Sequence, residues 1–354
     1  TPSSSSAASD VYKRQAYISV ESSIGDNFEF TAGVRQEEGL QQVNTYDLFS
    51  GVDSLIDKSI EEDYQLPSMT LTYLPEFDEN LQIRLGASQT IARPTFRELS
   101  PTLFIDVDTD RVIAGSLYLE NSEIDNIDLR LEYYFGFNQF FTAGIFSKEI
   151  LNPIEETVNE SGDLIITSYQ NVPLAEINGF EIEYEQVFEA IMDSPNDLLV
   201  KFNYTETESE VIVNPGDTYI NNIGTVVDAQ SLLANGRDTR LQGQSDTIAN
   251  FQIGLDNLQN QTQATLIVNY VSDSVRARGI DVLPDIIEEP PLLVDFAFSK
   301  IYSYPEFELK LSLELRNLLD EEYYASMRNI AIYDQYDLGT CLLYTSDAAD
   351  DELG

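Results

Sequence analysis

The sequence contains no histidine, no tryptophan and a single cysteine, and each of these absences excludes a class of function. Without histidine, the protein cannot use a Ser-His-Asp triad, histidine acid–base chemistry or a histidine-ligated zinc ion. One thiol can form neither an internal disulfide nor a cysteine-rich metal site. Most familiar hydrolytic and zinc-dependent enzymes are therefore excluded.

Basic residues are scarce as well. The chain has 19 Lys and Arg against 62 Asp and Glu, a formal net charge of −43. Because phosphate binding depends on clustered Lys and Arg, no nucleic-acid partner is expected. The charge fits an acidic proteome in salty water, where salt screens repulsion. A solvated acidic surface explains it equally well.

Long apolar runs are missing too. No stretch reaches the roughly 18 apolar residues of a membrane-spanning helix, and no signal peptide is recognisable. The 354 residues are enough for a sizeable core. They allow two or three small domains or one large β structure.

The two ends differ from the rest of the chain. Residues 1–15 and 341–354 do not follow the periodicity of their neighbours. Both resemble translated sequencing-adapter strings at the ends of metagenomic reading frames, the alternative being natural polar tails. We expect both ends to be non-native, like fusion scars, and Cys341 to belong to the second. Residues 16–340 are then a fragment cut at both ends, so the missing signal peptide says nothing about secretion.

Between these ends, apolar and polar residues alternate with a period of two over segments of about ten residues. The clearest segment is 307–315, where Phe and Leu alternate with Glu, Lys and Ser. The same alternation recurs in residues 27–35, 81–88, 127–134, 180–185 and 264–270. Successive side chains of a strand point to opposite faces, and no segment sustains a helical period. The sequence therefore predicts an all-β protein.

The connections between these segments alternate in length. Short turns are predicted near residues 23–26, 76–79, 135–138, 188–197, 257–260 and 302–305. Long polar connections are predicted near residues 37–63, 92–123, 151–173, 211–245 and 273–289. In an up-and-down sheet every second connection lies at the same end. About twelve strands in residues 16–317, joined in this way, predict an antiparallel transmembrane β-barrel rather than an evenly connected sandwich or propeller.

The charged faces of the strands are too polar to be buried dry. We therefore expect the apolar faces to meet lipid and the charged faces to line a polar lumen. The lumen-facing residues are predicted to be Glu29, Arg84, Asp128, Arg130, Glu132, Glu181, Glu183 and Glu185. Aromatic residues beside the short turns favour an interfacial girdle. A soluble antiparallel sheet with one solvated face is the alternative.

Several segments, in order, resemble the barrel of TonB-dependent outer-membrane receptors. Residues 90–101 are similar to the family's arginine–proline segment, residues 177–183 to its Gly-aliphatic-Glu strand start, and residues 317–324 to its Asn-Leu-aliphatic-Asp strand end. The positions matching these motifs are Arg93, Pro94, Gly179, Glu181, Asn317 and Asp320. The resemblance covers nearly all of residues 16–340.

The resemblance implies a 22-stranded barrel filled by a plug domain, with ligand bound on the outer loops. A TonB energy-transducing complex would act on the plug, importing a ferric siderophore, cobalamin or oligosaccharide across the outer membrane of a Gram-negative bacterium. It implies no catalysis and no cofactor. We expect the chain to lack the plug, the early strands and the final strand, so that it cannot close or transport alone. A passive porin-like barrel and a soluble β-rich carbohydrate-binding or glycosidase domain are the alternatives.

The motif residues carry structural expectations. Arg93 is expected to pair with lumen carboxylates, the alternative being a ligand-facing loop, and Pro94 to end the strand ladder. Gly179 is expected to permit close backbone approach or a bulge. Asn317 and Asp320 are expected to cap a strand end and start a turn.

The long connections hold the candidate ligand-binding residues. These are Tyr46, Asp106, Asp108, Asp110, Tyr219 and Asn221. Polar and aromatic side chains of this kind suit sugars or chelates. The alternating aspartates offer oxygen ligands of the kind that calcium takes, but the segment lacks the glycine and distant glutamate of a calcium loop. A solvated acidic loop is the stronger expectation, and no metal site is predicted.

Overall fold

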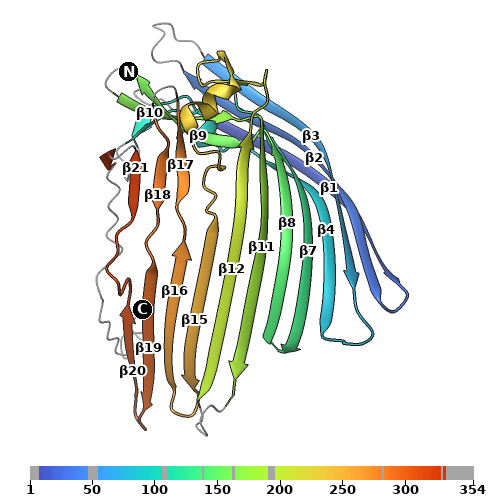
Figure 1. Ribbon diagram of the computed structural model, residues 1–354, viewed down its shortest axis with the longest axis vertical. Coiled ribbons are helices and arrows are strands. Elements are labelled where there is room, and N and C mark those ends of the chain that lie inside the picture. The colour runs from blue at the N-terminus through green and yellow to red at the C-terminus, as the bar shows by residue number, and fades with distance from the viewer. Residues whose placement is uncertain are drawn as a thin grey trace.

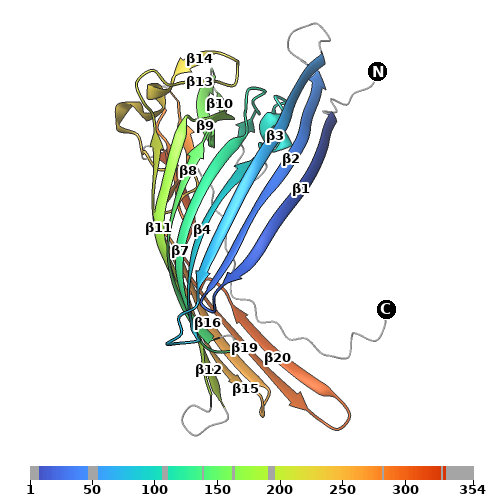
Figure 2. The ribbon, with the colours of Figure 1, turned by 90° about the vertical axis from the view of Figure 1, so that its right-hand side faces the viewer.

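A computed structural model describes residues 8–46, 55–105, 111–137, 139–161, 164–189, 196–280, 283–327 and 330–331, and its main feature is one 12-stranded sheet, here called the wall. Every strand pairs antiparallel with its neighbours. The wall is curved, with β7 to β12 in the middle of the curve and β1 and β20 at its two edges, so that it has a convex and a concave face (Figures 1 and 2). The strands are β1 (Ala8–Ile24), β2 (Phe28–Tyr46), β3 (Leu55–Tyr73), β4 (Leu81–Ala92), β7 (Ser122–Gly136), β8 (Gln139–Leu151), β11 (Leu174–Phe188), β12 (Asp197–Ile212), β15 (Thr247–Asn257), β16 (Thr262–Val271), β19 (Leu293–Ser303) and β20 (Glu308–Leu315). The predicted up-and-down β architecture is confirmed. Among the described residues β1 and β20 do not pair, so the wall is an open sheet.

The ends of the wall differ in the way the sequence predicted. Tight turns join the strands at one end and the longer connections lie at the other (Figure 1). The prediction of a long connection over residues 37–63 is wrong, because β2 runs to Tyr46 and β3 begins at Leu55. The acidic residues of this stretch look like a loop by composition. In the folded chain they lie in paired strands, as in the pair Glu37–Tyr64.

The interpretation of the chain ends stays a prediction. Residues 8–15 lie in β1, paired with residues 37–44 of β2. Residues 341–354 lie outside the described residues.

The long connections form a second structure, here called the loop layer. Its strands form an eight-stranded sheet in the order β22-β21-β18-β17-β9-β10-β6-β5, and a separate pair, β13 and β14. The bounds are β5 (Phe104–Ile105), β6 (Val112–Ile113), β9 (Ile154–Ser161), β10 (Leu164–Asn171), β13 (Thr218–Ile220), β14 (Val226–Asp228), β17 (Ser274–Gly279), β18 (Ile286–Glu289), β21 (Tyr324–Met327) and β22 (Ile330–Ala331). Helix α1 (Phe96–Leu99) and the 3₁₀ helix η2 (Ala229–Gly236) are short. No helix in the described part of the chain has the length and apolarity to span a membrane.

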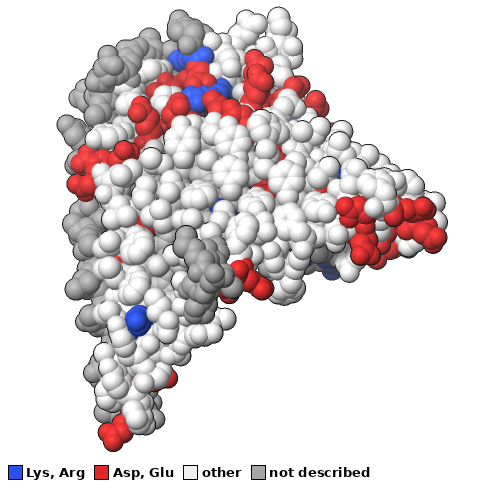
Figure 3. All heavy atoms as spheres, turned by 60° about the horizontal axis from the view of Figure 1, so that its bottom comes forward, with Lys and Arg blue, Asp and Glu red and all other residues white. Residues whose placement is uncertain are grey.

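The buried apolar clusters lie in the loop layer and the adjoining strand ends, not in the middle of the wall. One contains Tyr219 and Leu232, a second Val158 and Ile286, and a third Leu99. The convex face of the wall instead exposes large apolar side chains. Examples are Ile18, Val20, Met69, Ile127, Leu129, Ile145 and Phe180. In Figure 3 charged side chains gather at the margins of this face, and few lie between them.

Candidate functional site

The concave face of the wall carries a network of charged side chains centred on Arg130 of β7. Its guanidinium lies 2.7 Å from a carboxylate oxygen of Glu183 and 3.3 Å from one of Glu181, both on β11. Glu132, two residues along β7, is almost fully buried and lies 3.3 Å from Arg84 of β4. Two arginines and three carboxylates from three strands thus form one ion-pair network on one face, with one negative charge in excess.

The remaining predicted lumen residues lie on the same face. Glu185 forms an ion pair of 2.9 Å with Lys201 of β12. Asp128 lies against Gly86, where an added Cβ would come within 2.6 Å of a carboxylate oxygen. Glu29 is exposed on β2. The alternation along the strands therefore placed all eight on the concave side; that this side lines an aqueous lumen stays a prediction.

Arg93 bridges a gap in the wall. Strands β3 and β4 pair only between Ser68–Ser88 and Tyr73–Ile83, so β3 continues towards the loop layer without β4. Beyond this point Arg93 reaches back to Glu62 of β3 at 2.6 Å and Glu37 of β2 at 2.7 Å, two almost fully buried carboxylates. Of the two roles considered for Arg93, this geometry favours ion pairing.

Pro94 follows the end of β4 and leads into α1. Its carbonyl oxygen accepts a hydrogen bond of 2.7 Å from the Gln41 side chain. Thr95 then caps the helix in a capping box with Glu98. Pro94 therefore lies where the ladder stops and the chain turns into the loop layer.

Gly179 lies in β11, paired with Thr207 of β12 and Phe146 of β8. A Cβ added there would lie 2.5 Å from the carbonyl oxygen of Glu206 and 2.7 Å from the ring of Phe146. We expect Gly179→Ala to lower the free energy of unfolding by about 1–3 kcal/mol, since the backbone must shift. Gly254→Ala is the matched control, because its Cβ would approach no atom closer than 3.5 Å. Urea unfolding in detergent tests this, and equal losses for both variants would contradict it.

Asn317 and Asp320 form the turn that follows β20. Both adopt left-handed backbone conformations, with φ of 48° and 53°. The amide of Asp320 donates to the carbonyl of Asn317 at 2.9 Å, and the Asn317 side chain exchanges hydrogen bonds with the backbone of Glu321. Both motif residues therefore have a structural role in this turn.

A buried ion pair lies at the centre of the loop layer. Arg278 of β17 and Glu155 of β9 are fully buried and form two parallel contacts of 2.5 and 2.8 Å. Arg278 also donates to the carbonyl oxygens of Asp238 at 2.7 Å and Arg240 at 2.9 Å. One guanidinium thus joins three connections that are far apart in the sequence.

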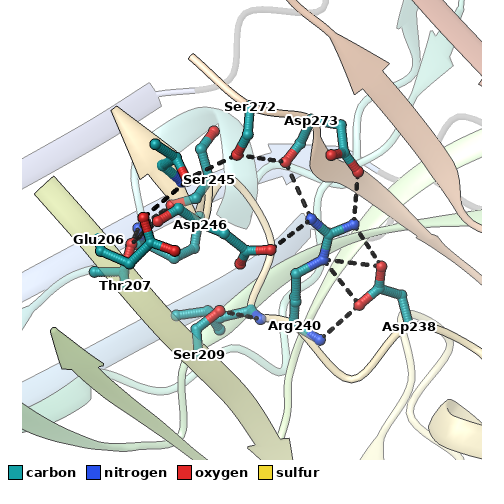
Figure 4. A network of polar contacts seen from close by, with 12 residues as sticks. Glu206, Thr207, Ser209, Asp238, Arg240, Ser245, Asp246, Ser272 and Asp273 are labelled. Atoms are coloured by element: carbon teal, nitrogen blue, oxygen red, sulfur yellow. Dashed lines mark hydrogen bonds and ion pairs between the residues drawn. The ribbon is translucent and has the colours of Figure 1, made fainter. Parts of the chain in front are cut away.

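Arg240 organises a second network beside this pair (Figure 4). Its guanidinium contacts the carboxylates of Asp238 at 2.7 Å, Asp273 at 2.9 Å and Asp246 at 3.4 Å. The backbone amide that follows it, of Leu241, donates to Ser209 of β12 at 3.1 Å. The network therefore fixes the chain after η2 against the upper ends of β12 and β16.

This network predicts acid sensitivity of the loop layer. Burial raises the pKa of Asp238, but the hydrogen bonds from Arg240 outweigh it and leave that pKa below its usual value. The carboxylate therefore stabilises the fold above the unfolded-state pKa of about 4, and this contribution is lost as the pH falls through the lower folded-state pKa. We expect hydrogen-exchange protection of residues 237–246 to fall over this range. The variant Asp238→Asn should have lower protection at pH 7 and a flatter profile, and a profile as steep as that of the unaltered protein would contradict the assignment.

The predicted ligand residues lie in different surroundings. Tyr219 is 6% exposed in an apolar cluster, and Asn221 accepts hydrogen bonds from the amides of Ile223 and Thr225 within its own turn. Tyr46 is the last residue of β2, and its side chain lies outside the described part of the structure. Residues 106–110, with the three aspartates, lie outside the described residues. A ligand role for these residues stays a prediction.

The loop-layer residues Glu155, Arg240 and Arg278 were not identified from the sequence. A partial signal was present, because Arg240 and Arg278 are basic residues in acid-rich connections and were therefore candidates for ion pairs. Sequence alone could not show which of the many carboxylates each cation contacts. Within the part of the chain that the structure describes, no group of three Asp, Glu, Cys or His could hold a metal ion.

The family described as "TonB dependent receptor-like, beta-barrel" matches residues 1–318. The chain belongs to this family. The family comprises transport receptors rather than enzymes. The soluble β-domain alternative loses its support, because an open antiparallel wall with an exposed apolar face is what a receptor barrel contains.

Solved structures show the same fold. The siderophore receptor PiuA from Acinetobacter baumannii is 14% identical with a TM-score of 0.60, and the match covers 95% of this chain and 42% of PiuA. The ferric-catecholate import receptor Fiu from Escherichia coli K12 is 13% identical, also with a TM-score of 0.60, and the match covers 90% of this chain and 42% of Fiu. The ferric yersiniabactin uptake receptor FyuA from Yersinia pestis is 14% identical with a TM-score of 0.58, and the match covers 91% of this chain and 44% of FyuA. The chain thus spans less than half the length of these receptors, and at such identities the likeness concerns the fold. No curated protein sequence matches the chain.

Proposed function

We propose that this receptor barrel is part of an outer-membrane protein of a Gram-negative bacterium, taking up a scarce nutrient such as a ferric siderophore, cobalamin or an oligosaccharide. Transport would be driven by the TonB energy-transducing complex and would involve no catalysis and no cofactor. The supporting observation is the family match over a wall with an apolar convex face and a charged concave face.

The height of the apolar face supports a membrane location. On β7 the outward residues from Ile127 to Phe135 are all apolar or aromatic, and Asp125 precedes them. At about 3.3 Å per residue this band is about 26 Å long along the strand. Because strands of outer-membrane barrels tilt by about 35–45°, this length corresponds to an apolar band about 20 Å tall, of the same order as the band of about 25 Å that such barrels carry. The apolar band of β7 is therefore compatible with a membrane barrel.

The loop layer is the proposed ligand side. Its apolar clusters and the Arg278–Glu155 pair give it a fixed shape, which favours recognition by a preformed surface over recognition by ordering on binding. We propose that the nutrient binds on the outer surface of the loop layer. Tyr46, Asp106, Asp108 and Asp110 remain candidate ligand residues from the sequence.

The membrane location can be tested on the chain itself. We expect it to refold to a β-rich, protease-resistant state in detergent micelles or lipid vesicles, and to aggregate without them, because the convex face has no cover. A monodisperse folded state in buffer alone would exclude a membrane barrel.

Energy coupling needs a different assay. The complete gene, recovered from the source DNA, would be expressed in a bacterium lacking its own nutrient receptors, with and without a functional TonB protein. We expect uptake of one radiolabelled class among ferric siderophores, cobalamin and oligosaccharides, and loss of that uptake without TonB. Equal uptake in both strains would identify a passive pore. The same DNA tests the proposal that residues 1–15 and 341–354 are not native.

A further inference from the structure

A groove crosses the convex face of the wall over β2, β3, β4 and β7. It has a volume of about 600 Å³, and Ala32, Met69, Ala87 and Ile127 line it. These four residues form one row of direct cross-strand pairs. The two alanines leave space, while Met69 and Ile127, 46% and 58% exposed, stand out from the sheet. The result is an apolar hollow of the size of a ligand site in the apolar convex face.

The groove has a polar end towards the loop layer. Gln89 of β4 and Asp125 of β7 line it there and are direct cross-strand partners. Asp125 is exposed and forms no ion pair with any residue in the described ranges. An amide and a free carboxylate thus lie where the apolar band ends, at the depth expected for lipid headgroups.

The charge pattern beside Asp125 favours a positively charged ligand. Asp125 is paired directly with Glu149 of β8, Glu149 with Glu176 of β11, and Glu176 with Glu210 of β12. Like charges directly opposite each other destabilise a sheet. A cation held beside Asp125 would relieve this repulsion, whereas an anionic group would increase it.

We propose that this groove binds a membrane lipid whose headgroup carries a protonated amine. The acyl chain lies along Ala32 and Ala87, and the ammonium group donates hydrogen bonds to Asp125, with Gln89 beside it. The proposal rests on the membrane location proposed above. A lipid is the occupant that fits, because the groove continues the apolar band and its polar end has complementary charge.

The absence of tryptophan in the chain makes a direct test possible. Met69→Trp introduces a single tryptophan in the groove, and Phe251→Trp introduces one on β15, on the same face but outside the groove. Each variant of the full chain is refolded into vesicles of phosphatidylcholine containing either phosphatidylethanolamine or phosphatidylglycerol with brominated acyl chains, which quench tryptophan on contact. We expect the relative association constant at the Met69→Trp reporter to be about threefold higher for phosphatidylethanolamine, the size expected for one partly exposed ion pair. At the Phe251→Trp reporter the two lipids should differ less.

Two further variants assign the preference to the carboxylate. In the Met69→Trp background, Asp125→Asn should reduce the preference to that of the Phe251→Trp reporter. Glu149→Gln removes the same charge from the neighbouring strand, outside the groove, and should leave most of the preference in place.

The quenching results distinguish a failure of the proposed lipid site from a failure of the proposed membrane location. Equal preferences at both reporters, or equal effects of Asp125→Asn and Glu149→Gln, would overturn the amine-lipid site while leaving the barrel in the bilayer. Quenching of neither reporter by either lipid would mean that the convex face does not meet lipid, and the proposed function would fail first.

Discussion

Replacing Arg278 with methionine should destabilise the loop layer by about 3–5 kcal/mol, because it leaves Glu155 as an uncompensated buried charge. Both side chains are fully buried, and they meet through two hydrogen bonds. The loss of stability should be confined to the loop layer, since the ion pair joins β9 to β17 and does not involve the strands of the wall. Hydrogen exchange of β9, β10 and β17 would measure the opening free energy.

Two variants show whether the loss comes from the buried charge. Arg316→Met breaks an ion pair whose side chains are 70% and 57% exposed, and should change stability by less than about 1 kcal/mol. Glu155→Leu combined with Arg278→Met removes both charges and should recover part of the loss. If the double variant were as unstable as Arg278→Met alone, the burial of an unpaired carboxylate would not be the cause.

A charged substitution on the convex face should also have a large effect on stability. Leu266 lies in the middle of β16, facing outward between Ile253 and Phe296. Leu266→Arg should lower the free energy of unfolding from a bilayer by about 2–4 kcal/mol, because the charge would lie near the membrane midplane. Reversible urea unfolding from lipid vesicles gives the value.

The matched control is on the same strand. Asn269→Arg places the same side chain on the concave face, beside Asn250, and should be tolerated within about 1 kcal/mol if that face is wet. Similar losses for the two variants would show that the faces do not differ in their solvent, and both the lipid-facing and the lumen-facing assignments would have to be abandoned.

The alternation of residues was sufficient to predict the wall. In residues 127–134 and 307–315 apolar and polar residues alternate with a period of two. Only one pairing register with the neighbouring strands then keeps all apolar side chains on the same face, since a shift of one residue would move them to the other face. That is why the strand number, the order and the concave position of Arg84, Arg130 and Glu183 could be predicted before the structure was known. Composition was a poorer guide, and it led to the incorrect loop over residues 37–63.

The sequence by itself determined that this protein is an all-β antiparallel sheet with one apolar and one charged face, because periodicity is a local property that each strand carries in its own residues. Only the tertiary structure decided how the long connections fold, since Glu155 and Arg278 are 123 residues apart and no local pattern records which of 62 acidic residues meets which of 19 basic ones. The same holds for Ala32, Met69, Ala87 and Ile127. They form a groove only when four strands align in one register, and Asp125 lies at its end because the strands pair in that way.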